Sequence, residues 1–159
     1  MRKLIAVLLL LAWTGLVQAT PAGVFRADAR APMARTYPAI HKALEDARFW
    51  VVFEADIGRN LAGFAAKWGE DYNRNGLTGI RSIVVCNGWY ANQVSNADPD
   101  LLALCPLRVN LVEKDGVTRV LFARPSVIAA GSPGAAAVQE IEQTLVRAIR
   151  TGIQQAEQP

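Results

Sequence analysis

The sequence predicts an α+β domain with a largely antiparallel sheet. Apolar residues recur at helical spacing near both ends of the chain, in residues 36–47 and 132–155. Runs rich in β-branched and aromatic residues lie between them. Two of these runs flank Lys114-Asp115-Gly116, and Asp-Gly between alternating runs is a strong β-hairpin signal. A few strands framed by helices, rather than a strict alternation of the two, indicate the α+β class.

The first nineteen residues have the pattern of a secretory signal peptide. Arg2 and Lys3 precede an apolar run, residues 4–17, which is shorter than the roughly 20 residues that span a membrane. Residues 17–19 (Val-Gln-Ala) place small side chains at the two positions that signal peptidase reads. We therefore expect cleavage after residue 19, no stable membrane insertion afterwards, and an exported chain, periplasmic or secreted. An uncleaved anchor helix is the alternative.

The mature chain is expected to form one domain. Residues 20–32 are rich in Ala, Pro and Gly and form a flexible lead-in, with a first strand suggested at residues 24–27. Residues 33–156 then hold the α+β domain, and residues 157–159 are a tail. The chain has 17 Lys and Arg against 14 Asp and Glu, and without the signal peptide the net charge falls from +3 to +1. So small an excess disfavours a nucleic-acid partner.

The first helix is expected to begin near Thr36. Thr36 is a suitable N-cap, and Pro38 then falls in the first turn, where a missing N–H costs little. His41, the only histidine, neighbours the polar face and is interpreted as a solvated or capping residue, with a haem ligand as the alternative. The apolar residues that share one face are Ile40, Ala43, Leu44 and Ala47.

A strand over residues 49–57 and a short helix over residues 61–68, with Asn60 as its N-cap, are expected next. Strict alternation along the strand defines two faces. One face would carry Phe49, Val51 and Phe53, and the other Trp50, Val52 and Glu54.

The following segment resembles the opening of a calcium-binding loop. Asp71, Asn73, Asn75 and Gly76 match the pattern D-x-N-x-N-G. Such a loop also needs a bidentate carboxylate at its twelfth position, which is Ser82 here. A tight turn is therefore expected, and calcium binding by Asp71, Asn73 and Asn75 is the weaker alternative.

The second half should contain three strands and two helical segments. The last helix carries an apolar stripe that is expected to pack against the sheet: Val138, Ile141, Leu145, Ala148, Ile149 and Ile153. The expected strands are residues 80–86, 107–113 and 117–123, with one or two helical turns over residues 88–96 and the last helix from Ser132 to Gln155.

Both cysteines lie in the stretch from Cys86 to Pro106. Three states remain open for them. A disulfide would close a loop and contribute roughly 3 kcal/mol. Two inert buried thiols are the second state. In the third, Cys86 is a functional thiol, because the helical turn that follows it would stabilise a thiolate. Two thiols and a distant histidine do not build a closed zinc site, so no metal and no other cofactor is predicted.

The same stretch contains the best candidate for a binding site. Asn87, Trp89, Tyr90 and Asn92 follow a strand end, where loops commonly carry function. Large aromatic side chains beside amides suit a small molecule or an exported partner protein. The alternative is that Trp89 and Tyr90 plug the end of the sheet. Cys86 and Arg108 complete the set of candidate ligand-binding residues.

These features favour a small exported protein without catalysis, which binds a ligand or a partner. A thiol-based redox or sulfur-handling protein that uses Cys86 is the alternative. A haem or metal carrier is weaker still.

The order of motifs resembles the domain of unknown function numbered 302. The resemblance rests on Cys86-Asn87-x-x-x-Ala91, a Pro-bounded turn, residues 104–109 (Leu-Cys-Pro-Leu-Arg-Val), a hairpin that ends in x-Pro, and the C-terminal helix. It covers residues 24–153 and implies a TATA-binding-protein-like β-α-β(4)-α fold. Helices would then pack on one face of a curved antiparallel sheet. The resemblance implies no activity and no DNA binding.

The sequence departs from this pattern in three places. Gly88 stands where the family tends to have Pro, and Cys105-Pro106 stands where it often has Pro-Cys. Residues 65–79 look like an insertion that could carry a site of its own.

Overall fold

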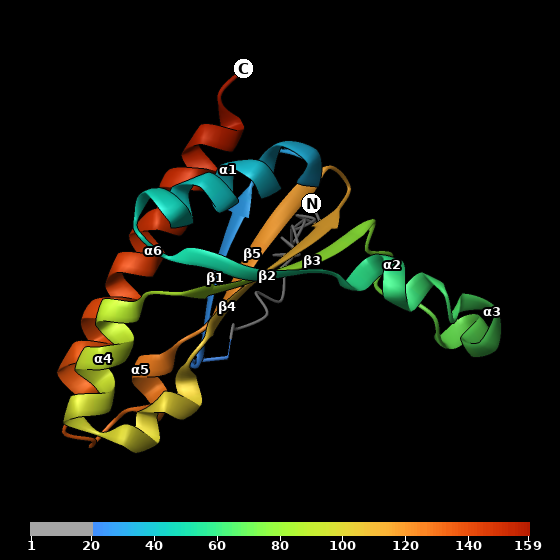
Figure 1. The fold of residues 1–159 in the computed structure, drawn as a ribbon. Coiled ribbons are helices and arrows are strands. Elements are labelled where there is room, and N and C mark those ends of the chain that lie inside the picture. Colours follow the sequence, from blue (N-terminus) through green and yellow to red (C-terminus); the bar gives the residue numbers. More distant parts are fainter. Residues whose placement is uncertain (1–20) are drawn as a thin grey trace, which may run out of the picture.

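Five antiparallel strands form one sheet in the order β1-β5-β4-β3-β2, and helices pack on one of its faces (Figure 1). The computed structural model describes residues 21–159, so the expected signal peptide lies outside the described residues. The strands are β1 (Val24–Ala29), β2 (Trp50–Asp56), β3 (Gly79–Cys86), β4 (Leu107–Lys114) and β5 (Val117–Ala123). The helices are α1 (Met33–Asp46), α2 (Ile57–Ala62), α3 (Ala65–Trp68), α4 (Gly88–Ala97), α5 (Pro125–Ile128) and α6 (Ala135–Glu157), with 3-10 helices at Gly69–Asp71 and Pro99–Leu104.

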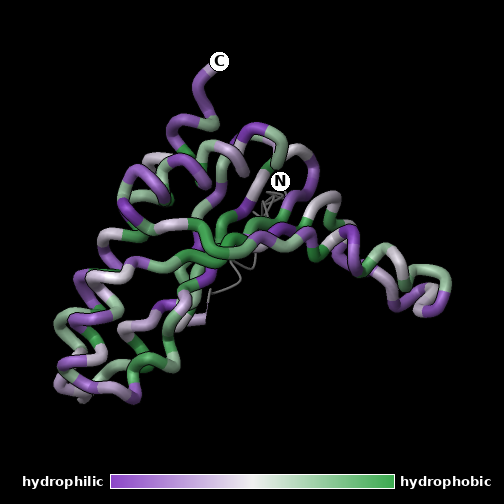
Figure 2. Tube along the Cα trace, viewed as in Figure 1, coloured by the Kyte–Doolittle hydropathy of each residue, from purple (hydrophilic) through white to green (hydrophobic). Residues whose placement is uncertain are grey.

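The α+β class and the helices on one face are confirmed. Apolar positions are most continuous at the centre of the sheet, and the helices alternate between apolar and polar positions (Figure 2). The suggested first strand extends to Ala29 and pairs with β5 along its whole length. Asp115 and Gly116 both have positive φ, as the tight hairpin between β4 and β5 requires. Within residues 21–159, no helix combines the length and the apolar character needed to cross a membrane.

The core lies between the sheet and helices α1 and α6. Alternate residues of the central strands face these helices and are at most 1% exposed: Ile83, Val85, Val109, Leu111, Val120 and Phe122. All six residues of the apolar stripe predicted for the last helix are buried in this core. Burial of large apolar side chains is the main favourable term in folding, which explains why the stripe predicts the position of α6.

Helices α1 and α6 touch at Gly152. A Cβ atom at this position would lie 2.9 Å from Ile40 Cα and 3.0 Å from the carbonyl oxygen of Ala39. Real Cβ atoms essentially never approach other heavy atoms within 3.0 Å. The absence of a side chain at Gly152 therefore sets the distance between the two helices.

The expected start of the first helix was wrong. Helix α1 begins at Met33, so Thr36 is buried inside it and Pro38 is an interior residue. The N–H groups of Arg35 and Thr36 both donate to the carbonyl oxygen of Pro32, which starts the helix one turn earlier. Glu113 of β4 accepts the N–H of Met33 and so caps the helix from a distant strand.

A β-bulge overturns the predicted faces of β2. Val51 pairs with Val85, but Phe53 rather than Val52 pairs with Val84, so one residue is added to β2. Phe53 therefore turns away from the helices and is 62% exposed. Glu54 turns toward α1, where it accepts a hydrogen bond from the hydroxyl of Tyr37.

Residues 57–78 leave the body as an arm between β2 and β3 (Figure 1). The single helix expected over residues 61–68 is instead divided between α2 and α3. Asp56 rather than Asn60 caps α2, because its carboxylate accepts the N–H of Arg59 at 2.9 Å. The rings of Phe64 and Trp68 stack with centroids 5.1 Å apart and remain 49% and 40% exposed.

Replacing Gly152 with Ala should destabilise the protein by roughly 1–3 kcal/mol, because the new methyl group forces α1 and α6 apart. Gly63→Ala is the matched control, since its Cβ would meet only the Asn60 carbonyl oxygen at 3.4 Å. Urea unfolding of both variants measures the difference. Equal stability of the two variants would contradict the close contact.

Candidate functional site

Asn87 joins two corners of the chain that are distant in sequence. Its side-chain oxygen accepts the N–H of Tyr90 at 3.1 Å and so caps helix α4. Its side-chain nitrogen donates to the carbonyl oxygen of Arg48 at 3.0 Å. Trp50 and Cys86 are direct partners across strands β2 and β3. The corner from α1 to β2 is thereby held against the corner from β3 to α4.

Arg48 occupies a backbone position that favours glycine. Helix α1 ends in a Schellman motif, in which Phe49 N–H donates to Leu44 O at 2.9 Å and Arg48 N–H donates to Glu45 O at 2.8 Å. The residue after such a helix end is usually Gly, because its φ is positive. Arg48 has a φ of 63°. An L-residue pays roughly 1–2 kcal/mol for the left-handed conformation, so the fold alone does not favour arginine here.

The two corners enclose a surface hollow of about 450 Å³. We call it the aromatic hollow. Trp50 and Trp89 line it and are 58% and 66% exposed. Among the described residues that line it, Arg48 alone carries a charged side chain. The N–H groups of Gly88 and Trp89 begin helix α4, where no helical carbonyl reaches them. The hollow thus combines two indole rings with a guanidinium group and the positive end of a helix.

The candidate residues from the sequence divide between this hollow and other places. Tyr90 lines the hollow and also packs in the core, because its ring stacks on Phe49 with centroids 5.9 Å apart and its hydroxyl donates to Glu140 at 3.3 Å. Asn92 is exposed on α4 and does not line the hollow. Arg108 is exposed on the sheet face away from the helices, opposite Val84 in the register.

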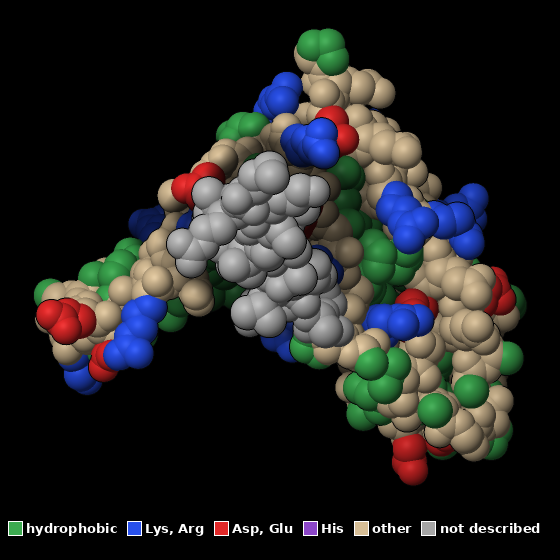
Figure 3. Space-filling model, turned by 180° about the vertical axis from the view of Figure 1, so that it is seen from behind, with side chains coloured by type: hydrophobic (Ala, Val, Ile, Leu, Met, Phe, Trp, Pro, Cys, Tyr) green, Lys and Arg blue, Asp and Glu red, His purple; other side chains and the backbone are tan. Residues whose placement is uncertain are grey.

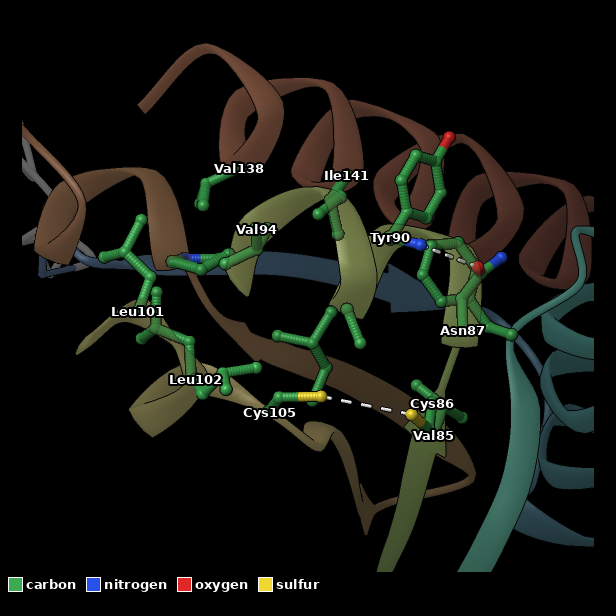
Figure 4. Close-up of a pocket in the computed structure, with 15 residues that line it drawn as sticks. Val85, Cys86, Asn87, Tyr90, Val94, Leu101, Leu102, Cys105, Val138 and Ile141 are labelled. Atoms are coloured by element: carbon green, nitrogen blue, oxygen red, sulfur yellow. Dashed lines mark hydrogen bonds between the residues drawn. The ribbon is translucent and has the colours of Figure 1, made fainter. Parts of the chain in front are cut away.

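The two thiols lie beside a second, smaller cavity that is partly open to solvent (Figure 4). The Sγ atoms of Cys86 and Cys105 are 3.9 Å apart, well beyond the length of about 2.05 Å of a disulfide bond. Both residues are therefore free thiols in this structure. The cavity measures about 40 Å³, so it holds a few water molecules but no larger ligand. Burial, together with the neighbouring Cys86, raises the pKa of the Cys105 thiol.

The loop that resembles a calcium site is organised by internal bonds. Asn73 accepts the N–H of Leu77 at 2.9 Å and donates to its carbonyl oxygen at 2.8 Å. Asp71 pairs with Arg74. In the part of the chain that the structure describes, no three His, Cys, Asp or Glu side chains gather closely enough to hold a metal ion. Calcium binding by Asp71, Asn73 and Asn75 stays a prediction without support from this geometry.

A groove of about 630 Å³ lies where the arm leaves the sheet. Trp68 lines it, and two of its charged side chains, Asp56 and Arg81, pair with each other. Arg81 lies 3.3 Å from Asp56, and its guanidinium also covers the ring of Tyr37 at 4.5 Å. Burial and the bond to Glu54 raise the pKa of Tyr37 to about 12, so this side chain stays protonated at neutral pH. The pairing with each other leaves the carboxylate of Asp56 and the paired nitrogen of Arg81 less available to a ligand.

His41 is not brought to the thiols. Its ring nitrogens lie 3.9 Å from Glu45 and 3.8 Å from Glu54, on the helix-covered side of β2. A Cys86–His41 pair for nucleophilic catalysis therefore has no geometric basis.

Basic and acidic side chains lie near each other on the parts of the face in Figure 3 that are coloured by side-chain type. Lys and Arg side chains are spread from the arm to the C-terminal helix and are interspersed with Asp and Glu. This distribution agrees with the near-neutral charge expected for the mature chain.

Arg48 and Trp50 were not identified from the sequence as residues of the candidate site. Trp50 was placed only on one face of a strand, and Arg48 was not singled out. One local signal points to Arg48: it follows a predicted helix directly, where Gly is the usual residue. No local signal brings Trp50 to Trp89, because their proximity depends on the pairing of β2 with β3.

Comparisons with known proteins support the fold and leave the site unassigned. A family model described as "Domain of unknown function DUF302" matches residues 25–152. No curated protein matches the sequence. The chain is similar to an uncharacterised conserved DUF302 protein from Bacillus stearothermophilus, known from its crystal structure. The two are 18% identical, with a TM-score of 0.70 over 82% of this chain and 98% of the other.

Asn87→Ala should cost roughly 1–2 kcal/mol, because it removes the cap of α4 and the bond to the Arg48 carbonyl. Asn87→Ser keeps a capping oxygen and should recover part of that loss. Thermal or urea unfolding compares the variants. Wild-type stability of Asn87→Ala would show that Asn87 does not hold the two corners together.

Proposed function

Because the chain belongs to DUF302, a family defined without an activity, its function has to come from its own surface; we propose that it is a non-catalytic binding protein. Its ligand would be an aromatic group that carries a carboxylate, bound in the aromatic hollow. Such a group occurs in small molecules and at the C-terminus of a partner protein. The observation that carries the proposal is the convergence of Trp50, Trp89 and Arg48 on one hollow.

The dimensions and the chemistry of the hollow support this ligand class. Its volume lies within the roughly 300–1,000 Å³ of small-molecule sites, whereas the cavity beside the thiols does not. Indole rings offer flat apolar faces to an aromatic ring. A guanidinium group binds a carboxylate through two parallel hydrogen bonds, and the start of α4 favours the same negative charge.

The strained backbone of Arg48 supports a binding role for its side chain. Glycine would relieve the positive φ, so arginine is retained at a cost to stability. Strained backbone conformations at non-glycine residues are typical of functional positions. In this proposal, Arg48 and the Trp, Asn and Tyr side chains of the hollow bind and orient the ligand.

The bulge in β2 favours contact through side chains rather than addition of a strand. β2 is an edge strand, and such strands often pair with a partner. A bulge interrupts the regular spacing that pairing needs. Trp50, Val52 and Phe53 remain exposed beside it and would extend the contact with a protein partner.

The signal-peptide pattern supports export of the protein to the periplasm or the medium. Binding would then take place outside the cytoplasm, with a solute or an exported protein as the partner.

The binding test uses 2-naphthoate as the probe. Its control is 2-naphthamide, which has the same ring system but no negative charge. Quenching of tryptophan emission should show saturable binding, with the carboxylate preferred. Trp89→Ala should abolish binding but change stability by no more than about 0.5 kcal/mol, because the side chain is mostly exposed. Arg48→Gly should weaken naphthoate binding about tenfold or more while raising stability by up to about 1 kcal/mol.

A second probe distinguishes a small-molecule ligand from the C-terminus of a partner protein. It is a peptide that ends in Phe and carries either a free or an amidated C-terminus. Preference for the free peptide over naphthoate would identify a protein C-terminus as the partner. Absence of binding to both probes, or binding that Arg48→Gly leaves unchanged, would refute the aromatic hollow as the site.

A second candidate function is thiol–disulfide exchange, which the 3.9 Å between the two Sγ atoms favours. Cys86 would attack the disulfide of a partner, and Cys105 would then attack the mixed disulfide. The products are a Cys86–Cys105 disulfide and two thiols on the partner. The raised pKa of Cys105 opposes this function, because the thiolate is the nucleophile.

Intact mass of the exported protein, with and without reduction, tests export and thiol state together. We expect a mature chain that begins at Thr20. If the exchange function holds, the chain gains two hydrogens on reduction, and peptide mapping joins Cys86 to Cys105. Thiols that alkylate without reduction would exclude a disulfide, and an intact N-terminus would contradict cleavage.

A further inference from the structure

The thiol pair forms a site that does not depend on the proposed binding function. Cys86 ends strand β3, and Cys105 follows the 3-10 helix Pro99–Leu104, so two separate segments each contribute one sulfur (Figure 4). Both thiols are partly exposed, which gives a solute access to them. Apolar side chains line the adjoining cavity, including Leu102 and Leu104.

The distance between the sulfurs suits a shared metal ion. A thiolate–metal bond is about 2.3 Å long, as measured for zinc. Two sulfurs on one ion therefore lie about 3.8 Å apart at a tetrahedral angle and about 4.6 Å apart in a straight line. The observed 3.9 Å lies at the tetrahedral end of this range, so an ion could bridge Cys86 and Cys105 in a bent arrangement, whereas a straight one requires the two sulfurs to move about 0.7 Å further apart.

We propose that the reduced Cys86–Cys105 pair binds one soft, thiophilic metal ion of low coordination number, with Cu(I) as the best match. Cu(I) is satisfied by two thiolates, and soft sulfur ligands select it. Zn²⁺ instead takes four ligands, or three and a water. The described residues offer no cluster of three or more His, Cys, Asp or Glu, so they do not complete a zinc site.

The surroundings suit the charge of the complex. Two thiols release two protons as they bind Cu(I), which leaves a single negative charge on the bis-thiolate ion. Arg108 lies opposite Val84, on the same sheet face as Cys86 and two residues from it in the register. Most side chains that line the pocket beside the thiols are apolar.

Proton release makes binding depend on pH. While both thiols are protonated, the affinity for Cu(I) should rise by up to about a hundredfold for each unit of increasing pH, because two protons leave for each ion bound.

The experiment titrates the reduced, oxygen-free protein with Cu(I) against a chromophoric Cu(I) chelator. We expect one ion per chain, ultraviolet thiolate-to-metal charge-transfer absorption, and the stated rise with pH. Cys86→Ser and Cys105→Ser should each lose chelator-resistant binding. Asn96→Ala, an exposed change on the last turn of α4, is the control and should bind as wild type.

A second measurement uses only the wild-type protein, in case a serine variant fails to fold. Bound Cu(I) should protect both thiols from alkylation, as peptide mapping would show, whereas Zn²⁺ at the same concentration should protect them less. Three outcomes would overturn the proposal: no binding by a protein with two titratable thiols, binding that survives the loss of either thiol, or a Cys86–Cys105 disulfide that reductants do not open.

Discussion

The contact between helices α1 and α6 is the constraint on which the remaining structure depends. Gly152 lets the two helices approach closely enough to cover one face of the sheet together. The position of α1 then fixes the corner at Arg48, where the chain turns into β2. Asn87 bonds to that corner from the start of α4. The aromatic hollow is therefore a consequence of how the core packs, although none of its exposed groups belongs to the core.

The parts of the fold that could be predicted are those specified by local pattern. The β4–β5 hairpin follows from Asp115-Gly116, and the burial of α6 follows from its apolar stripe, because both signals lie within one or two elements. The start of α1 could not be predicted, since Glu113 of a distant strand caps it. The exposure of Phe53 depends on a bulge that strict alternation does not reveal.

The candidate site was predicted only in part, for the same reason. Asn87 and Trp89 belong to the hollow, and the sequence singled out both. Trp50 joins them only through the register of β2 and β3. The two cysteines approach each other because the 3-10 helix Pro99–Leu104 returns the chain to the end of β3. Contacts of this kind depend on the finished fold, so spacing alone left three states open for the thiols.

The hollow and the thiol pair lie next to each other but offer different chemistry. Trp50 and Cys86 are register partners, and Asn87 follows Cys86 directly. The most direct test of the central claim is NMR chemical-shift mapping of the protein with 2-naphthoate. Our account predicts the largest shifts at the amides of Gly88 and Trp89 and at the indoles of Trp50 and Trp89. Shifts confined to the arm, or to the cavity beside the thiols, would contradict it.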